Sequence, residues 1–241
     1  MTDVASTGPD TADATGTAVA GGGPAGARAC HDLLVALAGR VPDRALWRLR
    51  DWLAAGADAA LRTAVPRTLL RHRIGVTDTE RELLREAVTA WRGSARLVDA
   101  VLHADTAPEA GTAFAEPGAA PWDTADLVLR AVVPAAGDVG EVRRAWRAGG
   151  SRVVLVSAAG DLAALTGIVQ RALRAQGDAA PRVEVIGAGT LTTGYHRAAL
   201  AASDVLWRAG APATAGAPDH ARLPDPRRGV PSSPPELVRH G

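Results

Sequence analysis

The spacing of apolar residues changes near residue 105, and that change decides what kind of fold the chain can adopt. Before residue 105 the apolar residues recur every three or four positions, which is the period of one buried helix face. After residue 125, short valine-rich runs such as 152–157 (RVVLVS) alternate with helical stretches, as in a parallel sheet covered on both faces. We therefore predict an α + α/β fold. A small helical bundle would precede a small parallel-sheet module of βαβαβαβ order, equivalent to half of a Rossmann or flavodoxin-like sheet.

Composition divides the chain further. Residues 1–27 contain almost no large apolar side chain and residues 211–241 hold seven prolines, so both ends are predicted to be disordered. Residues 105–125 are rich in Ala, Pro, Gly and Glu and are predicted to form a linker. These boundaries leave a helical module at 28–104 and an α/β module at 126–210.

Capping signals place the individual elements. Asp43 follows a proline and is expected to cap a helix that runs to about residue 55. Thr77 and Glu80 match a capping box, so a long helix is expected to follow them. In a helix predicted at 58–73, Pro66 is expected to produce a kink or to begin a new turn. In the second module we predict strands at 126–133, 152–157, 182–186 and 204–207, and helices at 138–148, 161–176 and 193–202.

Missing residue types exclude several chemistries. The sequence has no lysine and no asparagine, which excludes P-loop, Schiff-base and Ser–Lys chemistry as well as N-glycosylation. Cys30 is the only cysteine, so an intrachain disulfide and cysteine-rich metal sites are excluded too. Neither HExxH nor GxSxG occurs. We therefore expect no metal site and no cofactor, and the pattern favours a protein that is not an enzyme.

The overall charge argues against broad electrostatic attraction to nucleic acid or membranes. The net charge is +1, although residues 28–104 carry 13 arginines against 9 acidic residues. No stretch approaches the roughly 20 apolar residues of a membrane span, and the N-terminus lacks the apolar core of a secretory signal. We expect a cytoplasmic protein that does not contact membranes.

Two loops after predicted strands are candidate ligand sites. The carboxyl ends of parallel strands are where open α/β sheets bind ligands, and glycines let a backbone approach an anion. His196 is the one plausible acid or base among these residues, with Tyr195 as a second candidate. The alternative interpretation is that Asp161 is a helix N-cap, and that residues 187–197 form a βα loop with a threonine cap and solvated His196 and Arg197. The ligand-binding candidates are Ser157, Asp161, Gly187, Gly189, Thr190, Thr192, Thr193, His196 and Arg197.

The arginine-rich helices at 40–73 are a candidate surface for nucleic acid or for a protein partner. Arginine and histidine side chains at helical spacing could reach phosphates. In a chain without lysine, however, arginine also serves as the ordinary solvated cation, and an acidic protein partner or the chain's own acidic segments fit equally well. The candidates on this surface are Arg62, Arg67, Arg71, His72 and Arg73.

These observations lead to three functional hypotheses. The first is a non-catalytic regulatory protein that binds another protein. The second is a small-ligand-binding α/β domain whose ligand would be a nucleotide or a phosphorylated metabolite. The third is a DNA-binding regulator that uses residues 62–73, which the near-neutral net charge disfavours.

Overall fold

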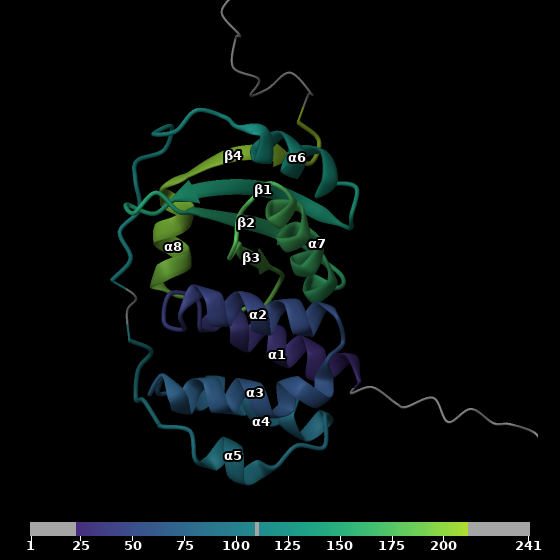
Figure 1. Ribbon diagram of the computed structural model, residues 1–241, viewed down its shortest axis with the longest axis vertical. Helices are drawn as coiled ribbons and strands as arrows, with labels where there is room; N and C mark the ends of the chain where they lie inside the picture. The colour runs from purple at the N-terminus through teal and green to yellow at the C-terminus, as the bar shows by residue number, and fades with distance from the viewer. Residues whose placement is uncertain (1–22, 109–110, 212–241) are drawn as a thin grey trace, which may run out of the picture.

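The computed structural model describes residues 23–108 and 111–211, which form eight helices and a four-stranded mixed sheet (Figure 1). The predictions of disorder at the chain ends fall almost entirely outside the described residues. In chain order the elements are α1 (Pro24–Ala36), α2 (Asp43–Ala54), α3 (Asp58–Arg71), α4 (Asp78–Ala90), α5 (Ala95–Asp99), α6 (Thr124–Val132), β1 (Val139–Trp146), β2 (Arg152–Ala158), α7 (Leu162–Ala175), β3 (Arg182–Ile186), α8 (Gly194–Ala201) and β4 (Ser203–Arg208).

The sheet is mixed, which corrects the all-parallel prediction. Its strand order is β3-β2-β1-β4. β2 and β3 are parallel and are joined through α7, as the sequence predicted, with Val154 opposite Val183. β1, however, is antiparallel to both of its neighbours, β2 and β4. The prediction was wrong because it placed the first strand one element too early in the chain.

Residues 126–133 were predicted as a strand but belong to α6. The run DLVLRAVV is rich in valine and leucine, and this composition favoured a strand. The deciding signal lies just upstream, where Asp123 and Asp126 form a capping box that begins the helix. Leu129 and Val133, four residues apart, are then fully buried, whereas Leu127 is 58% exposed.

Residues 138–148 were predicted as a helix but contain β1. Arg144, in this segment, is 1% exposed inside a central strand. It forms a buried ion pair with Asp126 of α6 and donates to the carbonyl of Pro121, 3.0 Å away. An arginine can occupy a central strand only where the tertiary structure supplies such partners, which local sequence does not reveal.

Two helix boundaries differ from the sequence prediction. α1 begins at Pro24, within the segment 1–27 that was predicted to be disordered, and proline suits the first turn because it lacks the unused N–H. Asp58–Arg71 is one helix with Pro66 inside it, so Pro66 does not split the helix. α2 begins at Asp43, but its N-cap is Pro42 and no side chain caps it, so the prediction that Asp43 caps this helix was wrong. Thr77 and Glu80 form the predicted capping box of α4.

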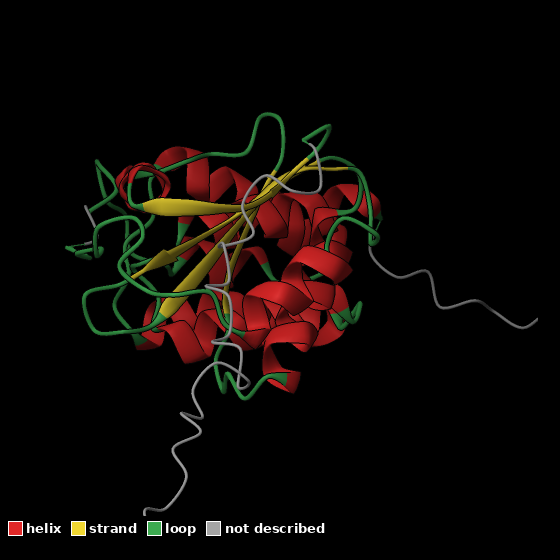
Figure 2. Ribbon diagram, turned by 90° about the horizontal axis from the view of Figure 1, so that it is seen from above, coloured by secondary structure: helices red, strands yellow, loops and turns green. Residues whose placement is uncertain are grey.

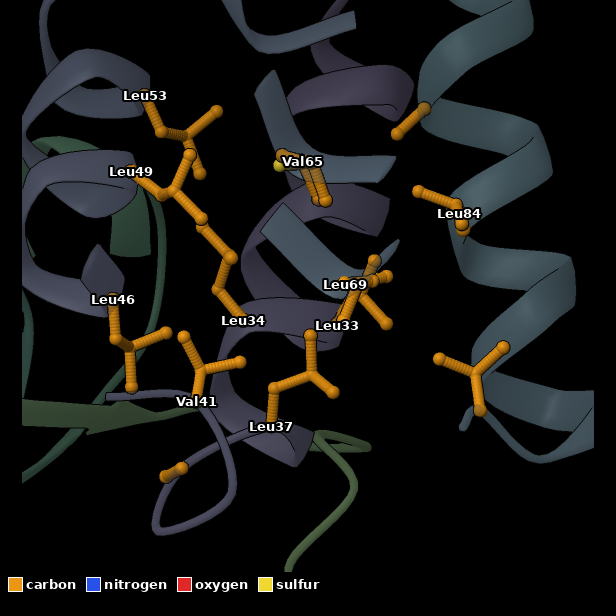
Figure 3. Packing of buried hydrophobic residues seen from close by; sticks show 14 of the residues in the cluster. Leu33, Leu34, Leu37, Val41, Leu46, Leu49, Leu53, Val65, Leu69 and Leu84 are labelled. Carbon is orange, nitrogen blue, oxygen red and sulfur yellow. The ribbon is translucent and has the colours of Figure 1, made fainter. Parts of the chain in front are cut away.

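Helices cover both faces of the sheet and one of its edges (Figures 1 and 2). α6 and α7 cover one face, where Val142, Val154 and Val183 are buried with side chains of those helices. Ala145 and Val153, which point to the other face, join the core of the helices α1–α4 and α8. Figure 3 shows how α1 fills the space between its neighbours. Leu33, Leu34 and Leu37 lie among Leu46, Leu49, Leu53, Val65, Leu69 and Leu84.

The edge of the sheet at β3 is closed by polar side chains from α1 and α2. His31 Nε2 donates to the carbonyl of Val185 at 2.9 Å, and Arg50 donates to the carbonyl of Val183 at 2.7 Å. These bonds satisfy backbone acceptors that an edge strand would otherwise leave open. None of the helices in the described ranges is long and apolar enough to cross a membrane.

Candidate functional site

The two loops predicted to bind a ligand leave the same edge of the sheet. Ser157 and Ile186 are opposite each other at the ends of parallel strands β2 and β3, so the loops that follow them begin side by side. Asp161 accepts a hydrogen bond from the Ala164 amide at 2.9 Å and caps α7. Ser157 and Asp161 are both exposed. The N-cap role accounts for Asp161 without a ligand.

The glycine-containing loop after β3 is held by α1. The Gly187 amide donates to Thr190 Oγ1 at 3.2 Å, and Thr190 Oγ1 donates to Asp32 of α1 at 3.0 Å. Arg28, also on α1, donates to the Ala188 carbonyl at 3.1 Å. The Gly187 amide, the Ala188 carbonyl and the Thr190 hydroxyl are therefore engaged in structural contacts.

His196 is buried, which corrects the interpretation that its side chain is solvated. Its side chain is 0% exposed, and its Nδ1 accepts from the Thr193 amide at 3.2 Å in the capping box of α8. Because Nδ1 is an acceptor, Nε2 carries the ring proton and donates to Glu184 Oε2 at 3.3 Å. The sequence indicated a polar residue at the start of a helix, but it did not indicate that Glu184 would bond its ring.

Arg50 and Glu184 form the buried ion pair at the centre of this network. The two guanidinium nitrogens of Arg50 contact the two carboxylate oxygens of Glu184 at 3.0 and 2.6 Å, and Arg50 also donates to the Leu34 carbonyl. Burial alone would raise the pKa of the Glu184 carboxyl, but Arg50 and the His196 hydrogen bond outweigh it and hold that pKa below its ordinary value. The network links α1, α2, β3 and α8. Because Glu184 and His196 are both buried from solvent, we assign it a structural role.

Three of the predicted ligand residues line one small cavity. Thr192, Thr193 and Arg197 border a cavity of about 250 Å³ at the start of α8, together with Arg40 and Tyr195. Burial raises the pKa of Tyr195 to about 12, and nearby Glu184 acts in the same direction. The Tyr195 hydroxyl accepts a hydrogen bond from Arg147 at 2.9 Å. Ser157, Asp161, Gly187, Gly189 and Thr190 are not among the residues that line this cavity.

A larger hollow lies between α2 and α3, and we call it the α2–α3 groove. It has a volume of about 660 Å³. Leu49, Trp52 and Ala64 belong to or pack against the main core, so the groove reaches down to apolar side chains. The complete lining is Pro42, Arg44, Ala45, Arg48, Leu49, Trp52, Ala60, Thr63, Ala64, Arg67, Thr68, Arg71 and His72.

The α2–α3 groove is basic, and no acidic residue lines it. Its four arginines and His72 are exposed, and none forms an ion pair or a side-chain hydrogen bond within the described residues. Asp43, at the start of α2, is engaged elsewhere by Arg147 at 2.8 Å and Arg182 at 2.7 Å. Arginines elsewhere, such as Arg40, Arg50 and Arg144, bond to carboxylates. The groove is therefore a concentration of uncompensated positive charge in a nearly neutral chain.

The structure brings together only part of the predicted basic surface. Arg67, Arg71 and His72 line the α2–α3 groove, whereas Arg62 donates to the Trp91 carbonyl at 3.3 Å outside it. Arg73 is exposed and follows the end of α3. The α2 wall of the groove, formed by Arg44, Arg48 and Trp52, was not among the predicted site residues. Their spacing of four residues places them on one helix face, and this was the signal available.

The described residues contain no group of three or more His, Cys, Asp or Glu side chains that could hold a metal ion. Comparison with protein-family models, with curated proteins and with solved structures finds no match to this chain.

Proposed function

We propose that this chain is a non-catalytic interaction protein that binds an acidic segment of another protein in the α2–α3 groove. The groove has an apolar floor, formed by lining residues that belong to or pack against the core (Ala45, Leu49, Trp52 and Ala64). The proposal rests on this floor together with four arginines and a histidine that have no acidic neighbour in the lining. Protein interfaces combine apolar anchors with complementary charge, and both tryptophan and arginine are enriched among the residues that dominate binding energy.

The apolar floor favours a protein partner over nucleic acid. A duplex would use the arginines for phosphate contacts but would leave Leu49, Trp52 and the alanines of the floor without a partner. An acidic polypeptide with apolar side chains uses both parts of the groove. We therefore favour an acidic protein partner over DNA, and the experiments below distinguish the two.

A second function has one supporting observation. The cavity at the start of α8 is bordered by Arg40, Arg197, Thr192 and Thr193, whose donors suit a phosphorylated metabolite. Thermal shift with inorganic phosphate and sugar phosphates tests this alternative. It requires a rise in melting temperature that is lost in Arg197→Ala, while the α2–α3 groove variants keep it.

Site-specific photocross-linking tests the principal proposal. A photoreactive side chain replaces Thr63, which lines the groove, and in a matched control it replaces Thr89, which is exposed on α4. In cells that naturally produce the chain, position 63 is expected to cross-link to an acidic peptide segment. The adduct should be lost when Arg67→Glu and Arg71→Glu are introduced.

The control position distinguishes binding in the groove from random collision. Equal adducts at positions 63 and 89, or adducts that survive the double charge reversal, would overturn the proposal. Adducts to nucleic acid at position 63 would replace it with the nucleic-acid hypothesis.

A further inference from the structure

We infer that the segment taken by the α2–α3 groove is an acidic amphipathic helix of about three turns. This inference rests on the proposed function and adds the conformation and charge pattern of the partner. A helix in a groove is an established mode of peptide recognition, in which side chains at i, i+3, i+4 and i+7 anchor the ligand.

The lining residues extend along most of both helices. On α2 they lie at positions 44, 45, 48, 49 and 52, and on α3 they begin at Ala60 and end just past the helix at His72. At 1.5 Å per residue, the 60–72 stretch is roughly 18 Å long. This length matches about 12 residues of a bound helix. A small molecule would need only a short part of it.

The floor allows a third helix to approach closely. Ala45 and Ala64 present only methyl groups to the floor, and exposed Ala60 also lines the groove, while Leu49 and Trp52 offer larger apolar surfaces. Packed helices lie about 8–10 Å apart, and small side chains at the contact permit the lower end of that range. An apolar stripe on the bound helix would thus extend the core that α2 and α3 already share.

The arginine walls of the groove require negative charge on both sides of the bound helix's apolar stripe. Arg44 and Arg48 come from α2, whereas Arg67 and Arg71 come from α3. Positive charge therefore flanks the floor from two helices that pack together (Figure 1). The complementary ligand carries Glu or Asp on both flanks of its apolar face. A helix with acidic residues on the face opposite its apolar stripe would place them away from these arginines.

Fluorescence anisotropy with the full chain tests the inference. The probe is a labelled peptide of about 16 residues, with leucines at helical spacing and glutamates on both flanks of the leucine stripe. The matched control is a scrambled peptide of the same composition, in which the leucines no longer share a face. We expect the helical peptide to bind at least about tenfold more tightly than the scrambled one and to gain helical circular dichroism on binding.

Variants then locate the binding. Arg67→Glu with Arg71→Glu should weaken binding of the helical peptide at least about tenfold, and Ala60→Trp should weaken it by obstructing the floor without any change in charge. The charge-matched control is Arg96→Glu with Arg171→Glu, two exposed residues outside the groove. That control should change the affinity less than about twofold, because the reversed charges lie away from the bound peptide.

The outcomes separate the inference from the proposed function. Equal affinity for the scrambled peptide would overturn the helical conformation, while the cross-link at position 63 could still support an acidic partner. Binding untouched by Ala60→Trp would show that the peptide does not lie in the groove and would overturn the inference. Displacement of the peptide by duplex or single-stranded DNA of equal charge, at equal or lower concentration, would overturn both.

Discussion

At the scale of single residues, two arginines occupy backbone conformations that favour glycine. Arg73 and Arg92 have φ values of 53° and 54°, in the left-handed region. Each follows the C-cap of a helix, and the Arg92 and Gly93 amides bond to the Thr89 and Val88 carbonyls as in a Schellman motif. α7 ends in the same way but places Gly177 there, with φ of 93°.

Replacing Arg92 with glycine is therefore expected to stabilise the chain. The left-handed conformation costs an L-residue roughly 1 kcal/mol, so Arg92→Gly should raise the free energy of unfolding by up to about 1 kcal/mol. Denaturant titration measures this change. The control is Glu86→Gly at an exposed position inside α4, which should lower stability by about 1 kcal/mol. A loss of stability in both variants would contradict the argument.

His31 makes stability depend on pH. Burial lowers its pKa from 6.5 to about 4, so the folded chain keeps the ring neutral where the unfolded chain protonates it. Between these values the unfolded state binds more protons, and stability must therefore fall as the pH falls from about 6.5 to about 4. We expect this residue to account for a loss of about 3 kcal/mol by pH 4.

The His31→Gln variant isolates that contribution. Glutamine does not titrate and still offers an N–H to the Val185 carbonyl. Denaturant unfolding at several pH values should show a shallower decline for the variant than for the unmodified chain. Parallel declines would mean that His31 is not the group responsible.

At the scale of elements, the contact between α2 and α7 depends on a glycine. A Cβ on Gly167 would lie 2.4 Å from the Cβ of Ala54, which is closer than two carbons can approach. Helix propensity alone would favour alanine at position 167 by about 1 kcal/mol. The cost of the steric conflict exceeds this gain in helix propensity, because the two helices would have to separate.

We therefore expect Gly167→Ala to destabilise the chain by about 1–3 kcal/mol, in spite of its better helix propensity. The second substitution Ala54→Gly removes the opposing methyl group and should restore part of the loss. Denaturant unfolding of the two single variants and the double variant measures the coupling. Additive effects would show that the two positions do not conflict.

At the scale of the whole molecule, the helices α1–α4 share a core with one face of the sheet. The largest cluster of buried apolar residues joins Leu33 and Leu34 of α1 to Val153 and Leu155 of β2. The Arg50–Glu184 pair crosses the same boundary with polar contacts. Neither the helices 24–99 nor the strands that follow can lose their structure without exposing this shared surface.

Thermal unfolding should consequently occur in one cooperative step. Scanning calorimetry is expected to give equal calorimetric and van't Hoff enthalpies, and Gly167→Ala should lower the single transition as a whole. Two separate transitions, with only one of them affected by Gly167→Ala, would show that the helices and the sheet unfold independently.

The sequence by itself determined the elements whose signals are local. Thr77 and Glu80 begin α4, Asp161 caps α7, and the valine-rich runs give β2 and β3, because capping and apolar patterning act within a few residues. It also indicated part of the α2–α3 groove, since Arg67 and Arg71 share a face at a spacing of four residues.

The tertiary structure alone decided the features that depend on distant partners. Arg144 can lie in the central strand β1 because Asp126 of α6 neutralises it, and His196 is buried because Glu184 and Thr193 bond both of its ring nitrogens. The α2–α3 groove forms only because α2 packs beside α3, which brings two arginine-bearing helix faces together. A buried charge requires a compensating partner in space, and sequence spacing does not specify which distant residue will provide it.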